Sequence, residues 1–112
     1  MADKVVARPL SQLDIAPTVA GILGFVIPEL DGKPIGIVQS WGCKDVVIII
    51  IDSLGYDLFI WLMPELRSLS DLANDGHLFR AKAVSNHTTP AIASILSGLL
   101  PEHHCIFDKA AH

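Results

Sequence analysis

The chain has 112 residues, of which 51% are hydrophobic and 18% are charged, and its formal net charge is −4 at pH 7. This length predicts one domain with a modest core. A composition this rich in apolar residues argues against a disordered chain and indicates a core that needs a partner surface to cover it. The negative charge and the scattered basic residues argue against nucleic-acid binding, which requires clustered Lys and Arg.

The first predicted element is a helix over residues 15–23, which follows a short lead-in. Asp14 is placed to cap this helix, and Gly24 is placed to end it. Pro17 fits because it lies in the first turn, where its missing N–H would have no partner within the helix. Residues 25–44 have the Pro and Gly content of a loop, with a short edge strand predicted at residues 35–38.

The second half of the chain predicts an alternation of strands and helices. The continuous apolar run at residues 46–51 predicts a strand covered on both faces. A helix over residues 64–74 follows, with Pro64 at its first position, then a less apolar strand over residues 77–84 and a helix over residues 90–99. This order predicts the α/β class, as a three-layer-type parallel sheet with βαβ crossovers.

Two of these strands lead into residues that can carry chemistry. Asp52 ends the first strand, and Thr88 and Thr89 follow the second strand, directly before the helix that Pro90 begins. Ligands of open parallel sheets bind at the carboxyl ends of the strands, so Asp52 and Thr88 are expected along one rim. A carboxylate there can hold a divalent cation, which lowers the pKa of a coordinated hydroxyl, and the helix start favours an alkoxide and a phosphate.

Each of these residues also has a structural interpretation. Asp52 can cap the turn Asp-Ser-Leu-Gly, and Thr89 can be the N-cap of the helix, which leaves Thr88 as the freer hydroxyl. His87 can orient or bind a substrate, or it can be a solvated loop residue. His103 and His104 suggest zinc, but adjacent residues of an extended segment point to opposite sides, which argues against one shared metal.

Residues 45–108 resemble the amino-terminal core of the alkaline phosphatase superfamily, especially its type I phosphodiesterase/nucleotide pyrophosphatase branch. That family places a metal-binding Asp after an apolar strand and a nucleophile in a Thr-x-Pro step, followed by a helix of the type SIxTGxxPxxHGI. The resemblance therefore implies that Asp52 is a metal ligand and that Thr88 is the nucleophile and a further ligand. It implies a site with two Zn²⁺, or Mn²⁺, and a phosphorylated small-molecule substrate near Thr89 and His87. Cys105 stands where the family usually has Gly.

Sulfatases of the same superfamily use a C/S-x-P-x-R step, and no Arg follows Thr88. Phosphodiester, phosphomonoester or phosphonate chemistry is therefore expected ahead of sulfate ester chemistry. The metal ligands that the family places downstream of its nucleophile have no match in this chain, so we expect an incomplete site. The expected function is part of a metal-dependent phosphoester hydrolase, completed by a homo-oligomer or a second polypeptide. The alternative is a non-catalytic interaction or oligomerisation module derived from the same fold.

Residues 1–44 are predicted to form a first segment, joined in one domain to the α/β core at residues 45–112. This segment is similar to the carboxyl-terminal closing helix and loop of the same family, through residues 13–18 and 28–34. Its position before the core implies a circular permutation, or the tail of one unit joined to the head of another. Asp14 is then expected to cap its helix and not to bind metal.

The sequence also bears on the cellular compartment. No signal peptide is recognised, and the longest apolar run is far below the roughly 18 residues of a membrane helix. Cys43 and Cys105 do not make a disulfide framework and are expected to be thiols in a reducing compartment. With Met1 as the natural start, these features predict a soluble cytoplasmic protein.

Overall fold

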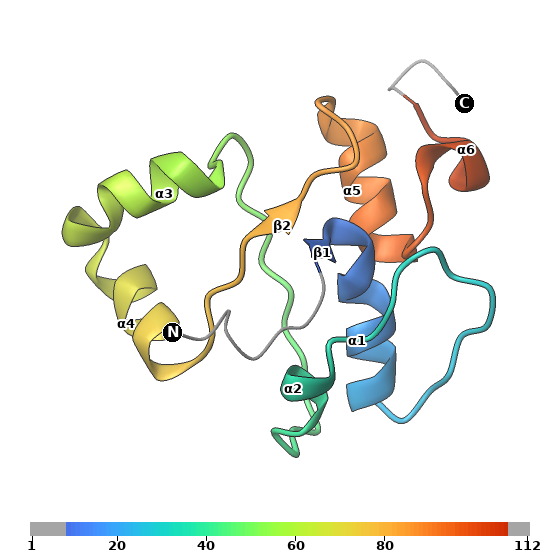
Figure 1. Cartoon of the computed structure of the whole chain (residues 1–112), viewed down its shortest axis with the longest axis horizontal. Coiled ribbons are helices and arrows are strands. Elements are labelled where there is room, and N and C mark those ends of the chain that lie inside the picture. Colours follow the sequence, from blue (N-terminus) through green and yellow to red (C-terminus); the bar gives the residue numbers. More distant parts are fainter. Residues whose placement is uncertain (1–8, 108–112) are drawn as a thin grey trace. The chain divides into compact units, whose positions relative to one another are not determined.

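The computed structural model describes residues 9–107, and it forms two compact units (Figure 1). Unit 1 contains residues Ile49–Arg80, and unit 2 contains residues Pro9–Ile48 together with the chain from Ala81 onward. About half of the residues are helical. Unit 2 holds β1 (Leu10–Ser11), a 3-10 turn (Gln12–Asp14), α1 (Ile15–Ile22), α2 (Gly36–Gln39), β2 (Ala81–Lys82), α5 (Thr88–Ser97) and α6 (Pro101–His104); unit 1 holds α3 (Tyr56–Leu62), a 3-10 turn (Met63–Glu65) and α4 (Arg67–Asp75).

Unit 2 contains a two-stranded parallel sheet. β1 pairs with β2 in the register Leu10 to Ala81 and Ser11 to Lys82, so the two halves of the chain meet in this sheet. α1 and α5 pack against each other, and α5 also contacts the 3-10 turn and α6. The predicted α/β class is confirmed and the two strands are parallel, but β1 lies where no strand was predicted. The three-layer arrangement is not seen among residues 9–107.

The helix predicted over residues 15–23 is confirmed as α1. Asp14 precedes it, but its side chain makes no hydrogen bond to the start of α1. Instead, its carboxylate accepts hydrogen bonds from the backbone N–H of Ser11 and of Lys33, both at 2.9 Å. Gly24 follows the helix with φ +86°, a conformation that glycine adopts without strain, which agrees with its predicted role as a stop.

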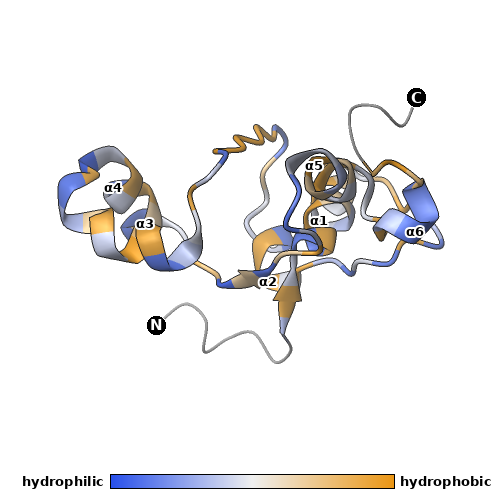
Figure 2. Cartoon of the chain, turned by 90° about the horizontal axis from the view of Figure 1, so that it is seen from above, coloured by the Kyte–Doolittle hydropathy of each residue, from blue (hydrophilic) through white to orange (hydrophobic). Residues whose placement is uncertain are grey.

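The prediction of a strand over residues 46–51 is wrong. The segment makes no ladder with any described part of the chain, and in Figure 1 it runs as a plain tube, with arrows only at β1 and β2. The hydrophobic colour nevertheless runs unbroken along it in Figure 2. A strand needs a neighbour that takes up its backbone hydrogen bonds, and its apolar pattern alone does not supply one. Its side chains consequently stay in water, with Val47 83% and Ile49 77% exposed.

Two further strand predictions are corrected. Residues 35–38, predicted as an edge strand, lie mostly in the short helix α2, which Ile35 precedes with an extended backbone. Of residues 77–84, Ala81 and Lys82 alone are in a strand. The pattern of each segment fits a half-buried strand, but strand formation depends on packing against neighbours more than on local sequence.

The helix predicted over residues 64–74 begins later than expected. Pro64 lies in the preceding 3-10 turn, and Leu66, with φ −103° and ψ 71°, separates that turn from α4. Unit 1 is held in part by Arg80, whose guanidinium carbon lies 5.4 Å from the centre of the Tyr56 ring. None of the residues in α3 or α4 is fully buried.

The core of unit 2 mixes apolar and polar side chains. Its fully buried hydrophobic residues are Leu10, Leu13, Ala20 and Ile95. Asp14, Thr18 and Ser94 are buried among them, and each side chain makes a hydrogen bond. Burial of polar groups is tolerated because these bonds replace those to water.

The N-terminal part of unit 2 is fastened to the end of α5. The backbone N–H groups of Asp31 and Gly32 donate to the carbonyl of Gly98 at 2.9 and 3.1 Å. The Asp31 carboxylate accepts a 2.7 Å bond from the N–H of Leu100 and contacts Nδ1 of His103 at 2.6 Å. These contacts join residues about seventy positions apart in the sequence and so fix α5 against the loop after α1.

Among the described residues, none of the helices has the length and apolar character required to cross a bilayer.

Candidate functional site

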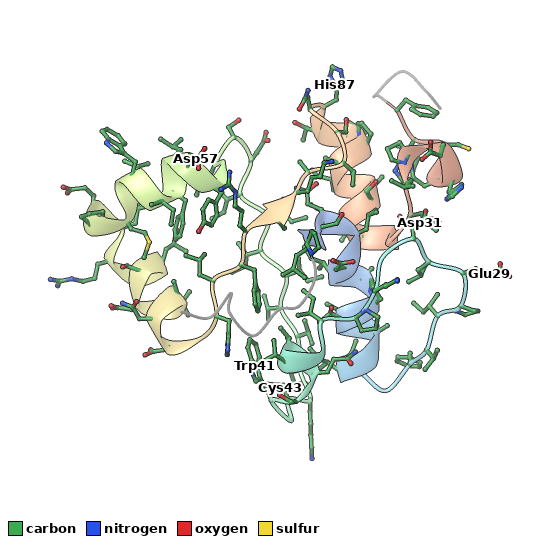
Figure 3. All side chains as sticks on the ribbon, viewed as in Figure 1. Glu29, Asp31, Trp41, Cys43, Asp57 and His87 are labelled. Carbon is green, nitrogen blue, oxygen red and sulfur yellow. The ribbon has the colours of Figure 1, made fainter. Side chains whose placement is uncertain are left out.

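The site predicted around the threonines lies at the start of α5. His87 is the N-cap residue, with φ −101° and ψ 139°, and Thr88 is the first residue of the helix. The hydroxyl of Ser85 accepts a 3.0 Å bond from the N–H of His87, which shapes the turn that leads into the helix. Figure 3 shows the labelled His87 side chain at this end of α5, directed away from the helix.

The two threonines differ in exposure. Thr88 is exposed, and Thr89 is half-buried one position further into the helix. The structural alternative for Thr89 is corrected here, because the N-cap is His87, whose own side chain makes no capping hydrogen bond. The partial positive charge at the start of a helix favours an anion or a developing alkoxide, and Thr88 is the exposed hydroxyl at that position.

Asp52 lies in a turn of unit 1. It is exposed, and its Oδ1 accepts a 2.9 Å hydrogen bond from the N–H of Ser53, whose φ is +61°. This is the local capping role that was the structural alternative for Asp52. The structure therefore brings Thr88, Thr89 and His87 together in unit 2, whereas Asp52 belongs to unit 1.

The adjacent histidines of α6 have different partners. His104 Nε2 lies 3.0 Å from the Ser94 hydroxyl, and its Nδ1 accepts a 2.9 Å bond from the N–H of Ile106. Since Nδ1 is an acceptor, a neutral His104 carries its proton on Nε2 and donates it to Ser94. His103 instead faces Asp31. Within residues 9–107 no group of three or more His, Cys, Asp or Glu side chains is arranged to hold a metal ion.

The Asp31–His103 pair shifts both pKa values. The N–H of Leu100, followed by His103, lowers the pKa of Asp31, because both stabilise the ionised carboxylate. The hydrogen bond that His103 donates to the Asp31 carboxylate raises the pKa of His103, because it stabilises the protonated imidazole. Asp31 was not identified from the sequence as a structural centre, although the Asp31-Gly32 dipeptide is typical of a turn.

Cys105 occupies the position where the resembled family has glycine. Its φ of +61° and ψ of 25° lie in the left-handed region, and it ends α6. Its N–H donates to the carbonyl of Pro101 at 2.8 Å. The backbone therefore keeps the turn that glycine favours, although it carries a cysteine there.

Comparison with known proteins gives one match. The sequence model of the Sulfatase family matches residues 44–111, which is more than half of the chain. Neither the curated proteins nor the solved structures include a match to the chain. The matched range contains Asp52, the threonines and α5, and its carboxyl end lies outside the described residues. The chain belongs to the sulfatase family, and thereby to the alkaline phosphatase-like superfamily of hydrolases.

Proposed function

We propose that this chain carries the nucleophile-bearing part of a phosphoester hydrolase in which Thr88 attacks phosphorus. The observation that carries the proposal is the exposed Thr88 hydroxyl at the first position of α5, inside the range that matches the family. A helix start is a favourable place for a phosphate, because backbone N–H groups and the helix dipole both point toward it. The half-buried Thr89 and the exposed His87 flank this position as substrate-binding residues.

The reaction would proceed in two displacements. The Thr88 oxygen forms a bond to phosphorus while the bond to the leaving oxygen breaks, which gives a phosphothreonine and a released alcohol. Water then cleaves the new bond and restores Thr88. The proton lost by Thr88 balances the proton gained by the leaving group. His87, the exposed N-cap residue next to Thr88, would contact the substrate oxygens.

A phosphoester is preferred over a sulfate ester because of the residues after the nucleophile. Thr88 and Pro90 stand at the first and third positions of the sulfatase step, where the first residue would be Cys or Ser. Ile92 stands at its fifth position, where an Arg would be expected. A threonine in a Thr-x-Pro step without that Arg resembles the phosphodiesterase branch and not the sulfatases.

The superfamily generally depends on divalent metals, but the described residues do not fit a complete metal site. Asp52 offers one exposed carboxylate, and no cluster of three ligands surrounds it or Thr88 within residues 9–107. We propose that Asp52 and Thr88 are two of the ligands for Zn²⁺ or Mn²⁺ and that another polypeptide or another copy supplies the others. The proposed attack on phosphorus is argued from Thr88 and the start of α5 alone.

The position of residues 1–44 supports the proposed rearrangement of the fold. We propose that this segment is the closing element of the family fold, placed before the core by permutation or by fusion. Its hydrogen bonds to the end of α5 support this proposal, since the N–H groups of Asp31 and Gly32 donate to the carbonyl of Gly98 and the Asp31 carboxylate accepts from the N–H of Leu100.

The second candidate function is a non-catalytic interaction module. Within residues 9–107, no cluster of metal ligands is found and eighteen large hydrophobic side chains are exposed, and both observations favour such a module. A module of this kind needs neither Asp52 nor Thr88.

Hydrolysis of bis-p-nitrophenyl phosphate by the full chain, with Zn²⁺ or Mn²⁺ added, separates the two functions. p-Nitrophenyl sulfate serves as the second substrate. The hydrolase proposal expects turnover of the phosphodiester that Thr88→Val abolishes, that Thr88→Ser partly retains, and that Asp52→Asn weakens by reducing metal affinity. Turnover that survives in Thr88→Val, or a preference for the sulfate, would contradict the proposal. No turnover in any variant would leave the interaction module, or a hydrolase whose other ligands come from a different polypeptide and not from a second copy.

A further inference from the structure

An uncharged groove lies between the two central helices of unit 2. Its volume is about 410 Å³, and its walls come from α1, α5 and the loop that follows α1. We call it the α1–α5 groove. It is lined by Ala16, Val19, Ala20, Leu23, Phe25, Val26, Ile27, Ile48, Ile95, Leu96 and Ser97.

The rim of the α1–α5 groove is apolar and exposed. Val26 is 93% exposed, Phe25 64% and Leu96 61%, and Leu23, Ile27 and Ile48 are exposed beside them. A fully exposed aromatic side chain has about 150 to 250 Å² and the aliphatic side chains have less, so the six side chains leave about 500 Å² in water. This value lies within the range of the largest apolar patch on a typical monomer, about 300 to 600 Å².

We propose that the α1–α5 groove is the docking surface for a second copy of this chain. An interface about a two-fold axis uses the same patch on both copies, so that patch must be complementary to itself. The exposed Phe25 and Val26 side chains at the rim and the groove beside them provide two complementary parts of one patch. In the dimer, Val26 of each copy enters the groove of the other copy.

Area and charge both favour this occupant. Two patches of about 500 Å² bury about 1,000 Å² when they meet, which is about the area that a specific interface requires. The chain carries a net charge of −4, but no charged residue lines the groove, so two copies can approach there without placing like charges in contact. This proposal does not depend on the chemistry assigned to Thr88.

Sedimentation equilibrium of the full chain, from micromolar to submillimolar concentration, tests the proposal. The expected result is a mass that rises from 12.1 kDa toward twice that value. Leu96→Glu and Val26→Glu are each expected to weaken the dimer at least about tenfold, because each buries a carboxylate in an apolar contact. Leu72→Glu is the matched control, since Leu72 is 66% exposed on α4, outside the groove.

Three results would overturn the proposal. The first is a wild-type mass of 12.1 kDa at every concentration. The second is a dimer that withstands both groove variants, and the third is one that Leu72→Glu weakens as strongly as they do. Far-UV circular dichroism of each variant establishes that it is folded. If Leu96→Glu does not fold, Val26→Glu decides the outcome, because Val26 lies in a loop and is almost fully exposed.

Discussion

Replacement of Asp14 tests how the N-terminal segment is held in unit 2. Asp14 is 3% exposed, and its two carboxylate oxygens accept separate 2.9 Å bonds from the backbone of Ser11 and Lys33. The bond to Lys33 closes a loop of nineteen positions and lies beside the 2.8 Å bond from the N–H of Ile35 to the Thr18 hydroxyl. In Asp14→Ala both N–H groups lose this acceptor, with no side chain to replace it.

The expected loss in the free energy of unfolding follows from these two bonds. A hydrogen bond to a charged group contributes about 1.5 to 3 kcal/mol, and both bonds are only partly buried, so the lower end applies to each. Asp14→Ala is therefore expected to destabilise unit 2 by about 3 kcal/mol. Asp14→Asn keeps one accepting oxygen of the same shape and is expected to cost about half as much.

Urea unfolding followed by tryptophan fluorescence measures this loss. The chain has two tryptophans, Trp41 in unit 2 and Trp61 in unit 1, so Trp61→Phe makes fluorescence specific for unit 2. Asp71→Ala, at an exposed position of α4, is the control and should change the free energy by less than about 0.5 kcal/mol. An Asp14→Ala variant as stable as this control would refute the reasoning.

Three further predictions concern the turn after α5, the end of α6 and pH. Gly98 has φ +72°, and an added Cβ would lie 3.2 to 3.3 Å from three side-chain atoms, so Gly98→Ala should lower the free energy of unfolding by about 2 kcal/mol in urea titrations. Cys105→Gly should raise it by about 0.5 kcal/mol, because relief of the left-handed strain exceeds the added entropy of the unfolded chain, whereas Cys105→Ala should leave it unchanged. Because the pKa of His103 is raised, this residue stabilises the fold fully below pH 6.5, its ordinary pKa, and this stabilisation is lost as pH rises through the raised pKa. Because the pKa of Asp31 is lowered, this residue stabilises the fold above pH 3.8, and this stabilisation is lost as pH falls through the lowered pKa. Melting temperatures should therefore be highest between these limits at low salt, and Asp31→Asn should remove that maximum; a maximum that persists in Asp31→Asn would contradict this assignment.

The helices could be predicted from the sequence more reliably than the sheet. α1 and α5 have local signals, a stop glycine and an apolar face, that act within a few residues. Strand pairing depends on a partner that local sequence does not identify, and β1 pairs with β2 across about seventy positions. The β-branched run at residues 46–51 has the composition of a central strand but no partner strand among the described residues. Composition alone therefore gave a wrong strand prediction.

The candidate site was predictable in part for the same reason. The start of α5 places Thr88 and His87. The sequence predicted this helix to begin at Pro90, and it begins two residues earlier, at Thr88. The expected rim shared by Asp52 and Thr88 required two long neighbouring strands, and neither formed. Asp31 and Ser94 were missed because their partners, Leu100, His103 and His104, are recognised as neighbours only once the chain has folded.

Trapping of a covalent intermediate tests directly whether Thr88 is the nucleophile. The full chain is mixed with bis-p-nitrophenyl phosphate and Zn²⁺ or Mn²⁺, quenched in acid, digested and analysed by peptide mass spectrometry. We predict one p-nitrophenyl phosphoryl group on the peptide that contains Thr88, located on Thr88 and not on Thr89, and its absence in Thr88→Val. A label on another residue, or turnover without any label on Thr88, would contradict the assignment of this threonine as the nucleophile.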